Sequence, residues 1–224
     1  MKFYVVGTPI GNLEDITYRA VRILSEVDLI LCEDTRVTIN LLNKYGIKKP
    51  TMSYHSQSKL AKLDKILELI GEGKTLALVS DAGTPTISDP GSILVSTIRE
   101  TFPEVEVTAI PGASALVSAL SISGLPASEF IFLGFLPHKK GRETLFKEIS
   151  VTERTVVFYE SPHRIMKTLD SLKKYVGERK VVVARELSKI YEQIVSGSPT
   201  EVEKYFIDNK DKVRGEFVVL VSGK

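Results

Sequence analysis

Residues 75–91 read Thr-Leu-Ala-Leu-Val-Ser-Asp-Ala-Gly-Thr-Pro-Thr-Ile-Ser-Asp-Pro-Gly. The apolar run at 75–80 predicts a buried strand, and it passes directly into a loop rich in Gly, Pro, Asp and hydroxyl side chains. Open α/β sheets hold their ligands in such loops, at the carboxyl ends of strands. We therefore expect 79–91 to form the rim of a binding pocket. Asp89-Pro90 has a second interpretation as a helix start, because Asp favours the N-cap and Pro the first helical position.

Short β-branched or aromatic runs recur through the first half of the chain and alternate with helical patterns. The clearest helical pattern has apolar residues three and four apart, at Leu60, Leu63, Leu67 and Ile70. Alternation of this kind predicts a mostly parallel sheet covered by helices. Besides 75–80, the predicted strands of this half are 2–6, 29–32, 51–54 and 105–109.

The pattern restarts after Pro111-Gly112. Strands that follow one another without a helix, near 181–196, predict antiparallel pairs. Ser198 with Glu201 three residues later is the pattern of a capping box. We therefore expect two α/β domains, 1–112 with a mostly parallel sheet and 113–224 with a mixed sheet. The second half has predicted strands at 130–133, 155–159, 181–184, 190–196 and 217–221, and helices at 113–123, at 141–149, after Ser161-Pro162 and after Ser198-Pro199.

The composition is that of a globular protein. The 224 residues are 43% hydrophobic, enough to bury a substantial core, and the net charge of +2 provides no global basic field. Cys32, the only cysteine, excludes an intrachain disulfide and a zinc site built from cysteines. It ends an apolar run, so we expect a buried thiol. A single cysteine fits a reducing compartment. The sequence also shows no 18-residue apolar run and no signal-peptide pattern, so we expect a cytoplasmic protein with no membrane contact.

Charged side chains follow the predicted strand at 29–32. Glu33, Asp34, Thr35 and Arg36 stand together there. One interpretation is that Thr35 caps the next helix and Arg36 is solvated. Adjacent carboxylates repel unless something binds them, which favours a functional role for Glu33 and Asp34.

Charged groups also follow strands of the second half. Glu160, His163 and Arg164 come after 155–159, and Arg185 comes after 181–184. The densest basic cluster, 138–142, suits phosphate contact as well as a solvated loop. The small-residue segment from Pro111 predicts a helix start whose free N–H groups can bind a ligand, or close helix packing.

Several common ligand motifs are absent. Residues 7–12 do not have the spacing Gly-x-Gly-x-x-Gly, and the chain has no phosphate-binding P-loop and no Gly-x-Ser-x-Gly. The three histidines are scattered and form no set of metal ligands. Group transfer without a metal is the simplest remaining chemistry.

Taken together, the motifs resemble those of one known family over residues 3–222, in the expected order. The family is that of the bacterial small-subunit ribosomal RNA cytidine 2′-O-ribose methyltransferases, within the tetrapyrrole-methylase superfamily. The motifs are 8–13 with Asp15-Ile16, 33–36, 80–85 with 89–91, Pro111-Gly112, 124–126, 134–137, 158–161 with His163-Arg164, 185–187 and Gly215-Glu216.

The resemblance implies two α/β domains of the tetrapyrrole-methylase type, with the ligand cleft between them. It also implies S-adenosylmethionine as methyl donor, a homodimer, and 2′-O-methylation of a decoding-centre cytidine in 16S ribosomal RNA of the small subunit. The family often has a His-x-His-Asn-Glu-like stretch that reads His55-Ser56-Gln57-Ser58-Lys59 here, which leaves the role of that segment open. The methyl-donor residues implied by the resemblance are Pro9, Ile10, Gly83, Thr84, Ile87, Ser114, Ala115, Tyr159, Leu187, Gly215 and Glu216.

Methyl transfer to a ribose hydroxyl is an in-line displacement in which a carboxylate or histidine accepts the hydroxyl proton. Two alternatives stay open. One is a tetrapyrrole methyltransferase that acts on a small macrocycle, against which the acidic 33–36 motif and the basic loop argue. The other is a non-catalytic ribosome-binding module. The candidate proton acceptors, which the sequence does not rank, are Glu33, Asp34, Asp81, Glu160 and His163; the candidate phosphate ligands are Arg36, Lys139, Lys140, Arg142, Arg164 and Arg185.

Overall fold

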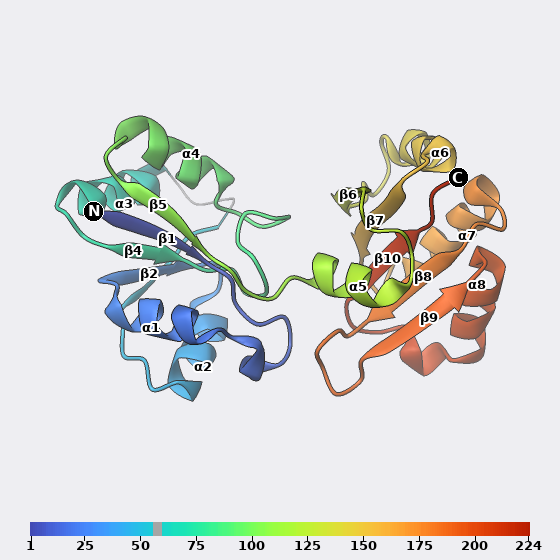
Figure 1. Ribbon diagram of the computed structural model, residues 1–224, viewed down its shortest axis with the longest axis horizontal. Helices are drawn as coiled ribbons and strands as arrows, with labels where there is room; N and C mark the ends of the chain where they lie inside the picture. The colour runs from blue at the N-terminus through green and yellow to red at the C-terminus, as the bar shows by residue number, and fades with distance from the viewer. Residues whose placement is uncertain (56–59) are drawn as a thin grey trace. The chain divides into compact units, whose positions relative to one another are not determined.

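The computed structural model describes residues 1–55 and 60–224. The chain divides into two compact units, Met1–Ser114 and Ala115–Lys224, and each has its own five-stranded sheet (Figure 1). The division falls between β5 (Glu106–Ile110) and α5 (Ala115–Ser123), the same connection as the predicted boundary after residue 112.

The first unit has a wholly parallel sheet in the order β3-β2-β4-β1-β5, which confirms the predicted class. The predicted strand at 75–80 is shorter than expected, because Val79 and Ser80 already belong to the loop that follows β4. The remaining strands are β1 (Lys2–Val6), β2 (Leu29–Cys32), β3 (Thr51–Ser53) and β4 (Leu76–Leu78).

Helices cover both faces of this sheet (Figure 1). On one face, α1 (Tyr18–Glu26) and α2 (Thr35–Lys44) pack against a cluster that includes Ile30 and Cys32. On the other, α3 (Leu60–Gly71) and α4 (Ser92–Thr101) pack against Leu31 and Leu78. Neighbouring residues such as Ile30 and Leu31 are therefore both buried, which is why the strands read as continuous apolar runs. The Cys32 thiol is buried as predicted.

The order in which the chain adds strands across this sheet reverses after β3. From β1 the chain passes through α1 and α2 to β2 and β3, and it returns through α3 and α4 to β4 and β5. As a result β4 lies between β1 and β2, and the loop after β4 leads to the opposite face from theirs. Open α/β sheets bind ligands at such a switch point, beyond the carboxyl ends of the strands.

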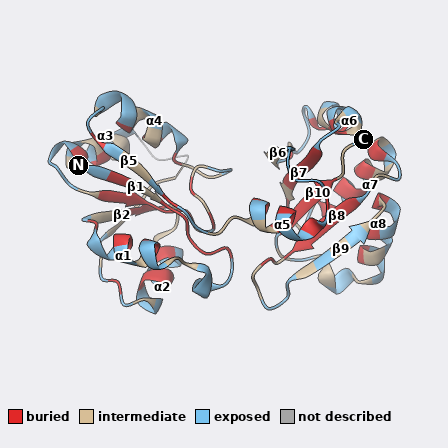
Figure 2. Ribbon diagram, in the orientation of Figure 1, coloured by how far each residue is buried: buried red, intermediate tan, exposed pale blue. Residues whose placement is uncertain are grey.

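The second unit has a mixed sheet in the order β6-β7-β10-β8-β9 (Figure 2 shows its central strands as buried). β6 and β7 are parallel, whereas β10 is antiparallel to β7 and β8, and β8 is antiparallel to β9, as predicted for this half. The strands are β6 (Phe130–Phe135), β7 (Thr155–Glu160), β8 (Val181–Arg185), β9 (Gln193–Gly197) and β10 (Phe217–Val221).

Three helices cover one face of the second sheet, and α5 lies on the other (Figure 1). Phe146, Leu169 and Phe206 from these three helices pack against Phe158 and Val219 in the largest core cluster. The helices are α6 (Arg142–Val151), α7 (Ile165–Val176) and α8 (Pro199–Asp208).

Two helix starts differ from the sequence predictions. The α2 helix is capped by Asp34, whose side chain accepts from the Arg36 N–H at 2.8 Å, and not by Thr35. The α7 helix begins at Ile165, after a turn, and not at Ser161-Pro162. The capping box of Ser198 and Glu201 at α8 is confirmed.

Asp89 does not cap α4. The cap residue is Gly91, which makes no side-chain capping hydrogen bond, so helix capping leaves Asp89 unexplained. Within residues 1–55 and 60–224, no helix is long and apolar enough to cross a membrane.

Candidate active site

Three strand-end loops of the first unit contact one another through their backbones. Thr8, after β1, and Gly83, after β4, exchange N–H to carbonyl hydrogen bonds of 2.9 and 3.1 Å. The Thr8 hydroxyl also donates to the Ser80 carbonyl at 3.1 Å. A Cβ on Gly7 would lie 2.8 Å from Cα of Gly112, after β5, so only glycines allow this approach. These contacts hold the ends of β1, β4 and β5 in one place.

Several residues of the predicted methyl-donor pocket lie at this meeting point. Gly83 has φ +83°, and a Cβ there would lie 3.3 Å from Cγ2 of Ile10 and 3.5 Å from the Ala113 carbonyl oxygen. The Thr84 hydroxyl donates to the same carbonyl at 3.3 Å. The backbone of Gly83 therefore packs closely against Ile10 and the Ala113 carbonyl at the switch point, in a conformation that favours glycine. Ser114 and Ala115 follow Ala113 directly.

The loop between β4 and α4 has an unusual backbone. Thr86 and Ser88 have φ of 74° and 63°, the left-handed region that non-glycine residues avoid, and Gly91 has φ 125°. Each such non-glycine residue costs about 1–3 kcal/mol, and they cluster at catalytic and ligand-binding sites. The exposed Ile87 lies between the two strained residues. A plain connection between a strand and a helix does not need this strain.

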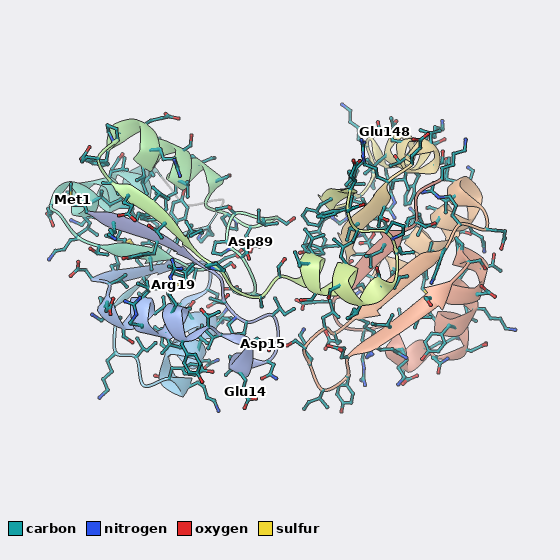
Figure 3. The ribbon with its side chains drawn as sticks, in the orientation of Figure 1. Met1, Glu14, Asp15, Arg19, Asp89 and Glu148 are labelled. Carbon is teal, nitrogen blue, oxygen red and sulfur yellow. The ribbon has the colours of Figure 1, made fainter. Side chains whose placement is uncertain are left out.

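Asp89 stands out among the carboxyl groups of this loop (Figure 3). Burial raises its pKa to about 6; a Ser80 hydrogen bond opposes this shift, and the charges of Glu33 and Asp81 add to it. Burial and the charge of Asp81 also raise the pKa of Glu33, against an opposing effect of His55. The chain continues from His55 into 56–59, which lie outside the described residues.

Asp34 differs from its neighbour Glu33. Its carboxylate forms an ion pair with Arg36 at 2.6 Å, and hydrogen bonds from the Arg36 side chain and backbone lower its pKa to about 2. The Asp34 N–H donates to Oδ1 of Asp81 at 2.9 Å, which ties the end of β2 to the loop after β4. Asp34 is thus ionised, and its cap and its ion pair give it a structural role.

We predict that Asp89→Asn stabilises the protein in a pH-dependent way. A carboxyl group whose pKa rises from 3.8 to about 6 on folding binds its proton more tightly in the folded state. Stability is then lost as pH rises through this interval, and a neutral amide removes the loss. The melting temperature of Asp89→Asn should exceed that of the wild type by more at pH 8 than at pH 4.5. An equal difference at both pH values contradicts the assignment.

The second sheet also gathers predicted site residues at one edge. Its register pairs Phe135 with Tyr159, and Phe217 with both Glu160 and Arg185. The carboxyl ends of β6, β7 and β8 and the start of β10 therefore meet there. Tyr159 makes ring contacts with Phe132 and Phe135 at centroid distances of 5.0 and 5.5 Å. The other predicted methyl-donor residues at this edge are Leu187, Gly215 and Glu216.

Glu186, which the sequence analysis missed, organises this edge. Its Oε1 accepts from the Glu216 N–H and from Lys189 Nζ, both at 3.0 Å, and Lys189 also pairs with Glu216 at 2.7 Å. Burial alone would raise the pKa of Glu186, but these donors outweigh it and lower the pKa. A Cβ on Gly215 would collide with the Glu186 carboxylate. The charged motif after β8 is visible in the sequence, but Gly215, which packs against the Glu186 carboxylate, is distant in the chain.

Glu160 is a fully buried carboxylate with many partners. It accepts from the Thr168 hydroxyl at 2.6 Å and from the Ser161 N–H at 2.8 Å. It pairs with Arg164 at 2.7 Å and with Arg142 at 3.7 Å. These donors engage both carboxylate oxygens of Glu160 in the core. The structure therefore places Glu160 in a buried network, not at a reactive surface.

Of the arginines predicted to contact RNA, Arg142, Arg164 and Arg185 are turned inward, whereas Arg36 is exposed and pairs with Asp34. Arg142 is 7% exposed and donates to the Pro137 carbonyl at 3.3 Å, and Arg164 donates to the Leu136 carbonyl at 2.7 Å. Arg185 is 3% exposed. Their charges serve the fold, which differs from the exposed phosphate ligands that the sequence suggested. His163, Lys139 and Lys140 are exposed, and the loop that carries the two lysines is fixed by the Glu160 network.

We predict that Glu160→Ala lowers the free energy of unfolding by about 3–5 kcal/mol, because it leaves two buried guanidinium groups without their anion. Chemical denaturation measures the change. The matched control is Glu148→Ala on the exposed face of α6, labelled in Figure 3, which should change stability by less than about 0.5 kcal/mol. Similar small effects of both variants would show that the network does not hold the second unit together.

Residues 2–203 match the sequence profile of the family described as Tetrapyrrole (Corrin/Porphyrin) Methylases. This chain belongs to that family. Curated relatives named "Ribosomal RNA small subunit methyltransferase I" resemble it over nearly its full length. The protein of Thermotoga maritima is 49% identical over 100% of this chain and 99% of its own. That of Halalkalibacterium halodurans is 46% identical over 98% and 75%, and that of Escherichia coli O157:H7 is 44% identical over 99% and 78%.

Solved structures of methyltransferases share the fold. The methyltransferase CobJ matches with a TM-score of 0.70 at 20% identity, over 99% of this chain and 93% of its own. The cobalt precorrin-4 methyltransferase CbiF matches with a TM-score of 0.69 at 18% identity, over 99% and 94%. These tetrapyrrole-methylase family members confirm the predicted fold class of two α/β domains. The predicted resemblance to the ribosomal RNA methyltransferases is likewise confirmed by the relatives above.

Proposed function

We propose that this protein transfers a methyl group from S-adenosylmethionine to the ribose 2′-hydroxyl of a decoding-centre cytidine in 16S ribosomal RNA. The observation that carries the proposal is the similarity to relatives named as small-subunit ribosomal RNA methyltransferases, which extends over the whole chain. The carboxyl groups beside a strained, glycine-lined loop support the chemical step. A homodimer in the cytoplasm, acting on the small subunit, is part of the same proposal.

Two sets of residues are proposed to hold the methyl donor, which supplies an electrophilic methyl group on a positively charged sulfur. In the first unit, Gly83 supports this assignment, because its bare backbone faces Ile10 and Ala113. In the second, Tyr159 offers an aromatic surface beside Phe135 at the edge of the sheet. The complete sets are Pro9, Ile10, Gly83, Thr84, Ile87, Ser114 and Ala115 in and next to the first unit, and Tyr159, Leu187, Gly215 and Glu216 in the second.

The reaction forms a bond between the ribose oxygen and the methyl carbon, breaks the carbon–sulfur bond, and releases the hydroxyl proton. We assign the proton to the carboxyl groups after β2 and in the loop between β4 and α4, with Asp89 as the first candidate. A base works best when its pKa is near the working pH, and the pKa of Asp89 is raised to about 6. Asp34, with a pKa of about 2, is a far weaker base, and Glu160 is held by ion pairs.

We predict that at least one of Asp89→Asn, Glu33→Gln and Asp81→Asn slows single-turnover methyl transfer by about a hundredfold to ten-thousandfold, because an amide keeps the shape but cannot accept the proton. Affinity for the methyl donor and for RNA should remain. If Asp89 is the base, the wild-type rate rises with pH through about 6. Glu148→Gln, on an exposed part of α6, is the control. If all three variants keep rates within about threefold of wild type, the rate comes from alignment of the reacting atoms or from His163.

Lys139 and Lys140 are the proposed phosphate ligands of the second unit. The double variant Lys139→Ala, Lys140→Ala should flatten the salt dependence of RNA binding by about 0.7 in log–log slope per lost contact. Affinity for the methyl donor should not change. Arg142 is left intact, because its burial ties it to the Glu160 network. An unchanged salt slope, measured by fluorescence anisotropy, assigns these lysines to a solvated loop.

Labelled S-adenosylmethionine incubated with small subunits from cells that lack the enzyme tests the function directly. Mapping of the modified nucleotide should give one cytidine with a methylated 2′-oxygen. A rise in melting temperature with S-adenosylmethionine, and none with NAD or ATP, argues against a non-catalytic ribosome-binding module. Methylation of a tetrapyrrole macrocycle and not of the subunit supports the alternative of a small-molecule methyltransferase.

A further inference from the structure

The loop between β8 and β9, residues 186–192, is highly ordered for a surface connection. The Lys189 N–H donates to the Glu186 carbonyl and the Glu192 N–H to the Lys189 carbonyl, both at 3.0 Å. The Ser188 N–H donates to the Glu192 carboxylate at 2.5 Å. Glu186 and Ser188 adopt positive φ of 51° and 67°, a strained backbone for residues with side chains. The loop extends beyond the ends of both strands (Figure 1).

The tip of this ordered loop, residues 190–192, is exposed, whereas Leu187 is buried. Ile190 is 96% exposed and Tyr191 is 63% exposed. Fixing the backbone of one residue costs about 1–2 kcal/mol, and exposed apolar side chains return none of it. The strain and the order of 186–192 therefore do not serve the packing of its tip. The strained backbone and the hydrogen bonds give this loop a surface with a fixed shape.

Arg185 connects this loop to a second segment. Its side chain is 3% exposed and donates to the Tyr191 carbonyl at 3.1 Å and to the Arg214 carbonyl at 3.0 Å. The Arg214 guanidinium lies over the Tyr191 ring, 5.8 Å from the ring centre. A buried cation thus fixes the backbone of Tyr191, whose exposed ring lies beside an arginine. Arg214 also follows a short helix, Lys210–Lys212, that adds two lysines and one aspartate to this side.

An exposed aromatic ring beside an arginine has the chemistry of a surface for single-stranded nucleic acid. Bases stack on tyrosine rings and on guanidinium planes, and cationic groups hold the phosphates. Protein partners select wide apolar patches. Beside Tyr191 stand the exposed apolar Ile190 and the charged Glu192 and Arg214. Lys189 does not contribute, since Glu186 and Glu216 already pair with it.

We infer that Tyr191 and Arg214 form a stacking platform for an unpaired nucleotide of the RNA substrate, at the edge of the second sheet that carries Glu186 and Glu216. The inference rests on the proposed function for the presence of an RNA substrate. It adds a second RNA contact, separate from Lys139 and Lys140, whose contribution comes from stacking and not mainly from charge.

The experiment uses the full chain and a fluorescein-labelled single-stranded RNA of twelve nucleotides. Tyr191→Ala should weaken binding roughly 5- to 150-fold, the loss typical of one stacked base, with an unchanged salt slope. Tyr191→Phe keeps the ring and should bind as the wild type does. Arg214→Ala should weaken binding and reduce the salt slope by about 0.7. Tyr18→Ala, which removes a ring that is 98% exposed in the first unit, is the matched control and should change nothing.

Two further measurements separate the possible failures. Affinity for S-adenosylmethionine, by calorimetry, should be the same in Tyr191→Ala as in the wild type, since the Tyr191 backbone keeps its bond to Arg185. If the wild type methylates small subunits and Tyr191→Ala binds RNA equally well, the platform is wrong and the proposed function stands. If Tyr191→Ala instead changes the sedimentation of the protein, the surface contacts another protein chain, which overturns the inference. If the wild type binds and methylates no RNA, both proposals fall.

Discussion

The position of β4 between β1 and β2 is the constraint on which the candidate active site depends. Because the loop after β4 leads to the opposite face from the loops after its neighbours, the three loops separate at the edge of the sheet. The backbone pairing of Thr8 with Gly83 keeps two of them in register. The contact between Gly7 and Gly112 adds the loop after β5. Residues far apart in the sequence therefore share one place, beside the buried Val6, Val79 and Ile110 that end the same strands or follow them.

The sheets were predictable because their cause is local. The strands β2 and β4 of the first sheet are buried on both faces, so their apolar runs are visible without knowledge of their neighbours. Helix starts were less predictable, because a shift of one residue in the start of α2 changes its N-cap from Asp34 to Thr35. Asp89 was ambiguous for the same reason. Only the observed start of α4 at Ser92, after the cap residue Gly91, separates Asp89 from the helix and leaves it for the site.

The roles of charged residues were the least predictable part. The rule that ligands lie at strand ends located Glu33, Asp81 and Glu160 alike. What distinguishes them is the set of groups that faces each one, and those groups come from distant elements: Thr168 and Arg142 approach Glu160 from α7 and α6. An inward-facing arginine does not indicate a nucleic-acid surface here, since its planar fork satisfies buried carbonyls and carboxylates. Exposed lysines carry more information, because little in the fold uses them.

Glu160 and Asp89 show how two carboxyl groups acquire different roles from their surroundings. Glu160 is surrounded by hydrogen-bond donors, which engage both of its oxygens and link three elements of the second unit. Asp89 has burial and two neighbouring carboxyl groups against one hydroxyl, so its anion is unfavourable and its affinity for a proton is high. A general base has to be incompletely satisfied in this way, at a cost in stability. The strained backbone at Thr86 and Ser88 adds to that cost in the same loop. Because each unit has its own core, the fold can tolerate the unfavourable loop of the first unit without disturbing the network of the second.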